Sequence, residues 1–126
     1  MILFLLRRPQ FPFIVQIENR LVAAKSEGKL DEELQRLGPV EKDFHDAIDN
    51  AGEGWCLSTE HWVISPIWMR KKWTKAELVG AYNSSRCAEV TGKKYSEKSL
   101  SSKRFDRIHA EIAELILEAN RKERQT

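Results

Sequence analysis

The chain has 126 residues, of which 41% are hydrophobic and 32% charged, and its formal net charge is only +2. With four tryptophans and five phenylalanines, this composition predicts a packed core and excludes general disorder. Glycine and proline number only six and four, which argues against a loop-rich all-β fold.

The first residues, MILFLLRR, are apolar and then basic. A secretory signal has the opposite order and a longer apolar core, so we interpret Met1 to Leu6 as an edge strand or the start of a helix. No segment reaches the roughly 20 apolar residues of a membrane span. Cys56 and Cys87 lie far apart and form no CxxC motif. Two such thiols favour a reducing compartment, so we expect a cytoplasmic protein that binds no membrane.

The first half predicts two or three short amphipathic helices with an acidic surface. Apolar residues recur at helical spacing in two stretches: Ile14, Ile17, Leu21 and Ala24, and then Val40, Phe44, Ile48 and Ala51. Gly28 can end the first helix, and Asp31 can cap a short helix between the two stretches. Gly38 and Pro39 separate that helix from the next one.

Residues 52–73 lack a clear period and are rich in tryptophan and β-branched side chains. They leave open a short strand pair near 55–65 or a short helix just after it. We therefore divide the chain into an acidic helical region, residues 1–54, and a basic region, residues 55–126. These regions either pack as one domain or form two lobes.

A well-specified helix follows. Thr74 and Glu77 form a capping box, in which each side chain binds the main-chain N–H of the other residue. The helix is expected to continue until Gly92, which can end it in a left-handed conformation.

The last helix is expected to be capped by Ser101 and to carry an apolar seam. The seam residues follow at steps of three and four: Phe105, Ile108, Ile112, Leu115 and Ala119. The first four could join two copies in a homodimer, which would place two helices on adjacent DNA half-sites. If the first half of the chain covers the seam, a monomer results.

Charge is distributed unevenly along the chain. Residues 1–68 carry seven lysines and arginines against eleven acids, a net charge of −4. Residues 69–107 carry eleven against four, a net charge of +7. Such a basic block points to a polyanionic partner, with nucleic acid the first choice and anionic lipid the second.

Three cations crowd the first two turns of the expected last helix: Lys103, Arg104 and Arg107. A helix N-terminus is already positive, so carboxylates would be expected there. A phosphate backbone would neutralise both the cations and the dipole. We therefore predict that these side chains contact DNA, with further contacts from Ser101, Ser102, Lys93, Lys94, Lys98, Arg70, Lys71 and Lys72. The alternative is an ordinary solvated helix face.

The sequence from Trp73 to Ile108 resembles the winged-helix domain at the C-terminus of phage and plasmid primase–helicases. The matching residues are Leu78, Tyr82, Cys87, Gly92, Ser101, Phe105 and Ile108. The resemblance implies a DNA-binding helical module whose recognition helix carries the three cations. No glycine-punctuated β pair follows Ile108, so the wing is missing from its expected place. No helicase segment is present either, so the resemblance implies no ATPase activity.

Catalysis finds little support. On a helix, His45, Asp49 and Glu53 would be spaced one turn apart beside Asp46, which could form a metal or acid–base site. We prefer a solvated helix face for this cluster, and we interpret the isolated His61 as structural. The sequence has no glycine-rich phosphate loop, nucleophile elbow or zinc spacing. We expect no enzymatic activity, cofactor or metal.

The sequence thus predicts a mainly α protein, with a helical N-terminal half and a helix-turn-helix or winged-helix-like C-terminal half. The expected function is non-enzymatic DNA binding, as a regulator or accessory protein of a mobile element such as a phage. The alternative is a protein-binding adaptor or inhibitor with charge-asymmetric surfaces.

Overall fold

The computed structural model describes residues 2–38, 40–67 and 72–124. Within them, the strands are β1 (Leu3–Phe4), β2 (Phe13–Ile17), β3 (Arg20–Ala24), β4 (Phe44–Ile48), β5 (Gly54–Ser58) and β6 (Val63–Pro66). The helices are α1 (Glu27–Gln35), α2 (Lys75–Asn83), α3 (Arg86–Thr91), α4 (Glu97–Ser102) and α5 (Phe105–Arg124). The fold is mixed α/β, with 24% strand and 41% helix, so the expected mainly α fold is wrong.

The six strands form one sheet in the order β1-β6-β5-β4-β2-β3. Neighbouring strands are antiparallel except β1 and β6, which are parallel. The expected division between residues 54 and 55 falls inside β5, which pairs with β4 on one side and β6 on the other. The short strand pair expected near residues 55–65 is therefore present, as part of a larger sheet.

The first expected helix is instead the β2–β3 hairpin. Glu18 and Asn19 form its two-residue turn between the paired residues Ile17 and Arg20, and Glu18 has a φ of 58°. Both faces of β2 are covered, so nearly every residue of the strand is apolar and the alternation that marks a half-exposed strand is hidden. The apolar run therefore matched a helical period by coincidence.

The helix expected over Val40, Phe44, Ile48 and Ala51 is instead strand β4. Phe44 and Ile48 are four residues apart, a spacing that places side chains on one face of a helix and also on one face of a strand. The intervening His45 and Ala47 are buried on the other face of the sheet. A spacing of four could not distinguish the two structures.

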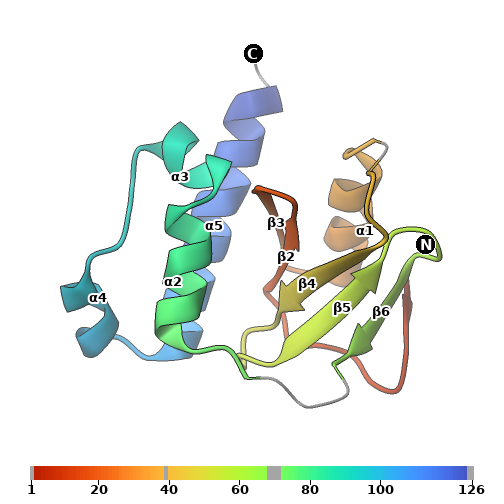
Figure 1. Cartoon of the computed structure of the whole chain (residues 1–126), viewed down its shortest axis with the longest axis horizontal. Coiled ribbons are helices and arrows are strands. Elements are labelled where there is room, and N and C mark those ends of the chain that lie inside the picture. Colours follow the sequence, from red (N-terminus) through yellow and green to blue (C-terminus); the bar gives the residue numbers. More distant parts are fainter. Residues whose placement is uncertain (1, 39, 68–71, 125–126) are drawn as a thin grey trace.

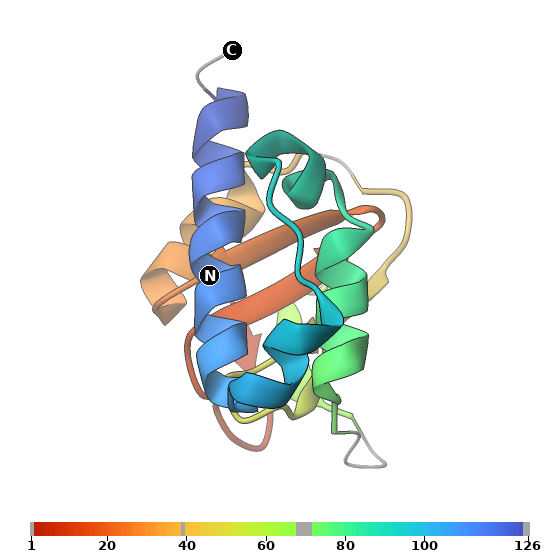
Figure 2. The ribbon, with the colours of Figure 1, turned by 90° about the vertical axis from the view of Figure 1, so that its left-hand side faces the viewer.

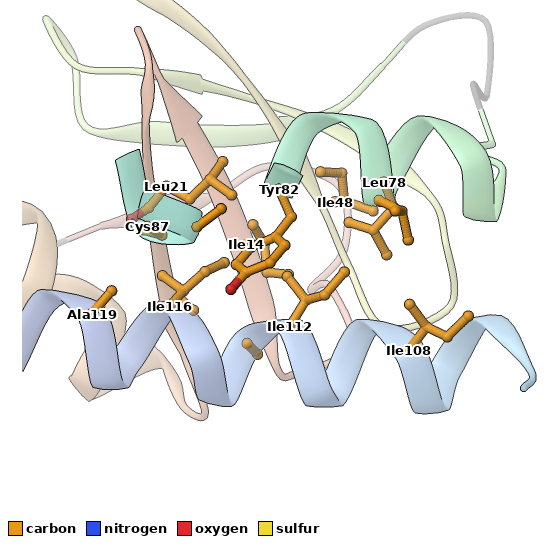
Figure 3. Packing of buried hydrophobic residues seen from close by; sticks show 14 residues of the cluster. Ile14, Leu21, Ile48, Leu78, Tyr82, Cys87, Ile108, Ile112, Ile116 and Ala119 are labelled. Carbon is orange, nitrogen blue, oxygen red and sulfur yellow. Dashed lines mark hydrogen bonds between the residues drawn. The ribbon is translucent and has the colours of Figure 1, made fainter. Parts of the chain in front are cut away.

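Helices cover both faces of the sheet (Figure 1). Helix α1 lies on one face, where its buried Leu30 and Leu34 pack in a cluster with Trp55. Helices α2, α3 and α5 lie on the other face, in a second cluster shown in Figure 3. There Ile112 of α5 and Tyr82 of α2 are fully buried. The core thus consists of two apolar layers separated by the sheet.

The capping box at the start of α2 is confirmed. The Thr74 hydroxyl accepts from the Glu77 N–H at 3.1 Å, and the Glu77 carboxylate accepts from the Thr74 N–H at 3.0 Å. The expected continuous helix up to Gly92 is divided, because α2 ends at Asn83 and α3 begins at Arg86. Gly92 ends α3 with a φ of 70°, as expected.

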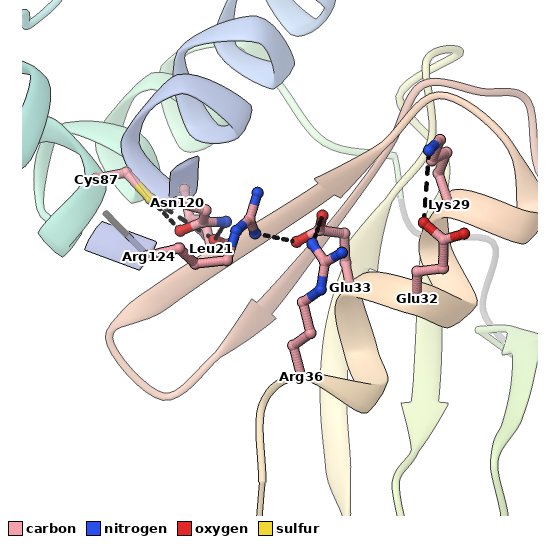
Figure 4. A network of polar contacts seen from close by, with 8 residues as sticks. All are labelled: Leu21, Lys29, Glu32, Glu33, Arg36, Cys87, Asn120 and Arg124. Atoms are coloured by element: carbon pink, nitrogen blue, oxygen red, sulfur yellow. Dashed lines mark hydrogen bonds and ion pairs between the residues drawn. The ribbon is translucent and has the colours of Figure 1, made fainter. Parts of the chain in front are cut away.

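The C-terminal part of α5 is fixed to β3 and α1 (Figure 4). The main-chain carbonyl of Leu21 accepts from the Asn120 amide at 3.2 Å and from the Cys87 thiol at 3.6 Å. One turn further along, Arg124 pairs with Glu33 of α1 at 3.0 Å. These contacts hold α5 beside the outermost strand and fix the direction in which its first turn points.

Candidate nucleic-acid interface

Three segments that are distant in sequence meet at one end of the molecule: the start of α2, the whole of α4 and the start of α5 (Figure 2). The Lys75 ammonium links them, because it donates to the main-chain carbonyl of Leu100 and to that of Lys103, the latter at 3.0 Å. Leu100 and Phe105 pack on the core beneath. Besides Lys75, these segments and their flanks carry five cations among the described residues, called here the basic end: Lys72, Lys98, Lys103, Arg104 and Arg107.

Two of the predicted DNA contacts converge on one carboxylate. The Lys103 ammonium lies 2.9 Å from Glu111 of α5, and the Arg107 guanidinium lies 3.6 Å from it. The Tyr95 hydroxyl also donates to Glu111, at 3.3 Å. The hydrogen bond from Lys103 is the main reason that the pKa of Glu111 is lowered, so this carboxylate is negatively charged at neutral pH.

Arg104 lies just before α5, and 86% of its side chain is exposed. Its guanidinium donates twice to Asp106, at 2.9 and 3.2 Å. This hydrogen bonding lowers the pKa of Asp106 and raises that of Arg104. Exposed ion pairs of this kind contribute only about 0–1 kcal/mol, so a phosphate can compete with the carboxylate for the guanidinium.

Lys93 and Lys94 are not part of the basic end as defined above but lie in the connection between α3 and α4. They line a cavity of about 540 Å³ along α5, together with Glu111 and Arg121. The cavity wall also contains Glu114 and Glu118, so its charge is mixed. Glu111 therefore borders both groups of predicted cations, Lys93 and Lys94 on one side and Lys103 and Arg107 on the other.

The predicted hydroxyl contacts lie in α4. Ser101 and Ser102 are exposed, and their hydroxyls donate to the carbonyl of Lys98 at 3.0 and 3.5 Å. The expectation that Ser101 caps the last helix is wrong, because α5 begins only at Phe105.

Lys98 and Lys72 are both exposed, and neither takes part in an ion pair between described residues. The predicted contacts Arg70 and Lys71 lie outside the described residues.

The apolar seam of α5 is already used inside the chain. Ile108 and Ile112 are fully buried against the sheet and α2, and Phe105 and Leu115 are partly buried on the same cluster. The homodimer stays a prediction, but Ile108 and Ile112 cannot also face a second copy.

The acidic cluster around His45 is dispersed. Asp49 is buried and accepts hydrogen bonds from its surroundings, whereas Glu53 pairs with Arg7. The His45 ring is buried, and its Nε2 lies 2.9 Å from the Lys42 carbonyl oxygen. Of the four side chains, only that of Asp46 is freely exposed. These residues form neither one site nor one solvated helix face.

Comparison with protein-family models, curated proteins and solved structures gives no significant match. Among the helices of the described residues, none has both the length and the apolar character needed to cross a bilayer.

Proposed function

We propose that this chain is a non-enzymatic DNA-binding module whose basic end contacts the phosphate backbone of duplex DNA. The observation that carries the proposal is the convergence of Lys103 and Arg107 on the Glu111 carboxylate. A carboxylate held by two cations and a hydroxyl group marks a position where an anion is favoured. A phosphodiester group of the DNA backbone carries a single negative charge, as that carboxylate does, and its oxygens likewise accept hydrogen bonds.

The local ion pairs do not prevent phosphate binding. Arg107 is 72% exposed and its contact with Glu111 is long, at 3.6 Å, so little energy is lost when its guanidinium rotates outward. The adjacent first turn of α5 adds main-chain N–H groups and the positive end of a 20-residue helix. Together they offer a fixed donor set and mobile cations, which is a combination suited to a sequence-independent backbone contact.

Charge-changing variants test this function. For each phosphate contact, the logarithm of the affinity falls by about 0.9 per tenfold rise in salt concentration. Relative to 1 M salt, two contacts therefore contribute about 1.8 log units at 0.1 M, and the double variant Lys103→Gln/Arg107→Gln should bind a 20-base-pair duplex about 60-fold more weakly. Lys29→Gln is the matched control, because Lys29 of α1 is about as exposed as Arg107 and also pairs with an acid, and its replacement should change affinity less than about twofold.

Glu111→Gln provides a change in the opposite direction. It removes the carboxylate that competes with phosphate, so duplex affinity should rise by roughly fivefold. Fluorescence anisotropy of a labelled duplex measures all three variants. Equal affinity for wild type, the double variant and Glu111→Gln would refute the proposed contact.

A second candidate is a protein-binding adaptor. It is favoured by the half of the sheet that α2, α3 and α5 leave open, where Phe44 is 68% exposed and Leu3 is 59% exposed. This alternative would prevail if the purified protein shifts no duplex at low salt, while a pull-down recovers one stoichiometric protein that is lost with Phe44→Asp.

A further inference from the structure

Three potential metal ligands meet where β4 begins and where β5 turns into β6. Asp43 precedes β4, and Glu60 and His61 lie in the turn between the other two strands. Their ligand atoms, two carboxylate oxygens and an imidazole nitrogen, all lie within 4.8 Å of one another. The pairing of Phe44 with Ser58 in the sheet brings these residues together.

The Asp43 carboxylate has a fixed orientation. Its Oδ1 accepts from the Ser58 hydroxyl at 2.7 Å and from the Glu60 N–H at 2.8 Å. Ser58 is buried, so this support is rigid, and its hydroxyl oxygen also accepts from the His61 N–H at 3.3 Å. Hydrogen bonds of this kind are what orients a carboxylate ligand in metal sites.

The two carboxylates have no ion-pair partner in the described part of the chain, although Lys42 lines the cavity that they border. Among the described residues, neither Asp43 nor Glu60 forms an ion pair with lysine or arginine. Among the described residues, several exposed acids have such a partner, as Glu27, Glu32 and Glu114 illustrate, whereas Glu41 and Asp46 have none. A bound cation would supply the missing positive charge.

We propose that Asp43, Glu60 and His61 bind a divalent transition-metal ion of the Zn²⁺ type. One imidazole nitrogen with two carboxylate oxygens suits zinc, whose bonds to such atoms are about 2.0–2.2 Å long. Because Glu60 and His61 are exposed, their side chains can rotate inward by the small distance needed. Three protein ligands leave a coordination position open.

That open position has space beside it. Asp43 and Glu60 also line a cavity of about 360 Å³, whose walls include Leu37, Val40 and Trp62. A metal ion there would border a partly apolar cavity, where a water molecule or a small anionic ligand could complete its coordination.

Isothermal titration of the full chain with ZnCl₂ tests the site. The reduced Cys56→Ser variant serves as the parent, because it removes the half-exposed thiol as a competing ligand. We expect one equivalent of Zn²⁺ to bind. His61→Ala and Asp43→Asn should each weaken binding by at least roughly tenfold. Asparagine retains the Oδ1 acceptor for Ser58 and Glu60, so that variant should still fold.

Glu41→Gln is the matched control. Glu41 is exposed and lines the same cavity but lies outside the ligand cluster, so its variant should bind Zn²⁺ within about twofold of the parent. Absence of a saturable heat, or binding that is unchanged in both His61→Ala and Asp43→Asn, would overturn the site. Neither result bears on DNA binding, because Lys103, Arg107 and Glu111 are unchanged in all these variants.

Discussion

Asp49 organises the turn between β4 and β5, and its removal is expected to be costly. The side chain is only 2% exposed. Its Oδ1 accepts from the N–H groups of Ala51 and Glu53, both at 3.0 Å. Its Oδ2 accepts from the Gln10 N–H at 3.3 Å and from the Trp55 indole at 3.1 Å. One carboxylate thus satisfies four donors from three segments.

Asp49→Ala leaves these donors without their acceptor. Trp55 is fully buried, so its indole N–H cannot reach water, and an unsatisfied buried donor costs about 1–3 kcal/mol. The three main-chain donors lie in turns where water can replace part of the loss. We expect the free energy of unfolding to fall by about 3–4 kcal/mol in total, a large fraction of the roughly 5–15 kcal/mol typical of a domain.

Urea denaturation followed by circular dichroism measures this change. Asp46→Ala is the matched control, because Asp46 lies in the preceding strand but is exposed, and its replacement should cost less than about 0.5 kcal/mol. Asp49→Asn should fall between the two, because the amide keeps one acceptor and places a donor against the other N–H groups. A loss in Asp49→Ala within about 1 kcal/mol of that in Asp46→Ala would refute the reasoning.

Two further stability predictions follow from buried groups. His109 is fully buried, with Nε2 2.9 Å from the Ile48 carbonyl oxygen and the Asn50 amide donating to Nδ1 at 3.3 Å, and burial lowers its pKa below 6.5. The contribution of His109 to stability is therefore complete above pH 6.5 and declines below it, because the unfolded chain binds the proton more readily. Thermal melts between pH 8 and 5 should show this decline, and in His109→Gln the melting temperature should depend less on pH. Gly52 has a φ of 86°, and a Cβ there would lie 3.3 Å from the Phe105 ring. Gly52→Ala should therefore lower the free energy of unfolding, measured in urea, by about 1–2 kcal/mol. Gly28→Ala is the control and should be neutral or stabilising, because a Cβ at Gly28 has no neighbour within 4 Å. Equal effects of the two glycine substitutions would contradict this strain argument.

Local sequence signals predicted only part of the local structure, because Ser26 and not Asp31 caps α1, and Gly28 and Ser101 lie inside helices. Thr74 with Glu77 gave a helix start and Gly92 a left-handed helix end, because both depend on side-chain chemistry within a few residues. The prediction of helices in the N-terminal half was wrong for two reasons. Strand β2 is buried on both faces, and strand β4 carries apolar residues at a spacing that also fits a helix. The turn formed by Glu18 and Asn19 was the only local sign of a hairpin, and it lacks the glycine that usually marks one.

The candidate site was partly predictable. The spacing of four between Arg107 and Glu111 is visible in the sequence, so their ion pair could have been anticipated. The contact of Glu111 with Lys103 depends on the break between α4 and α5, which the sequence did not indicate. The meeting of Asp43 with Glu60 and His61 depends on the register of β4 against β5 and has no local signal.

The salt dependence of duplex binding is the measurement that decides whether the basic end contacts DNA. Its five cations predict a plot of log affinity against log salt concentration with a slope near −4 to −5. In the double variant Lys103→Gln/Arg107→Gln the slope should decrease in magnitude by about two. Absence of duplex binding at low salt, or a slope that the double variant leaves unchanged, would contradict the proposed function.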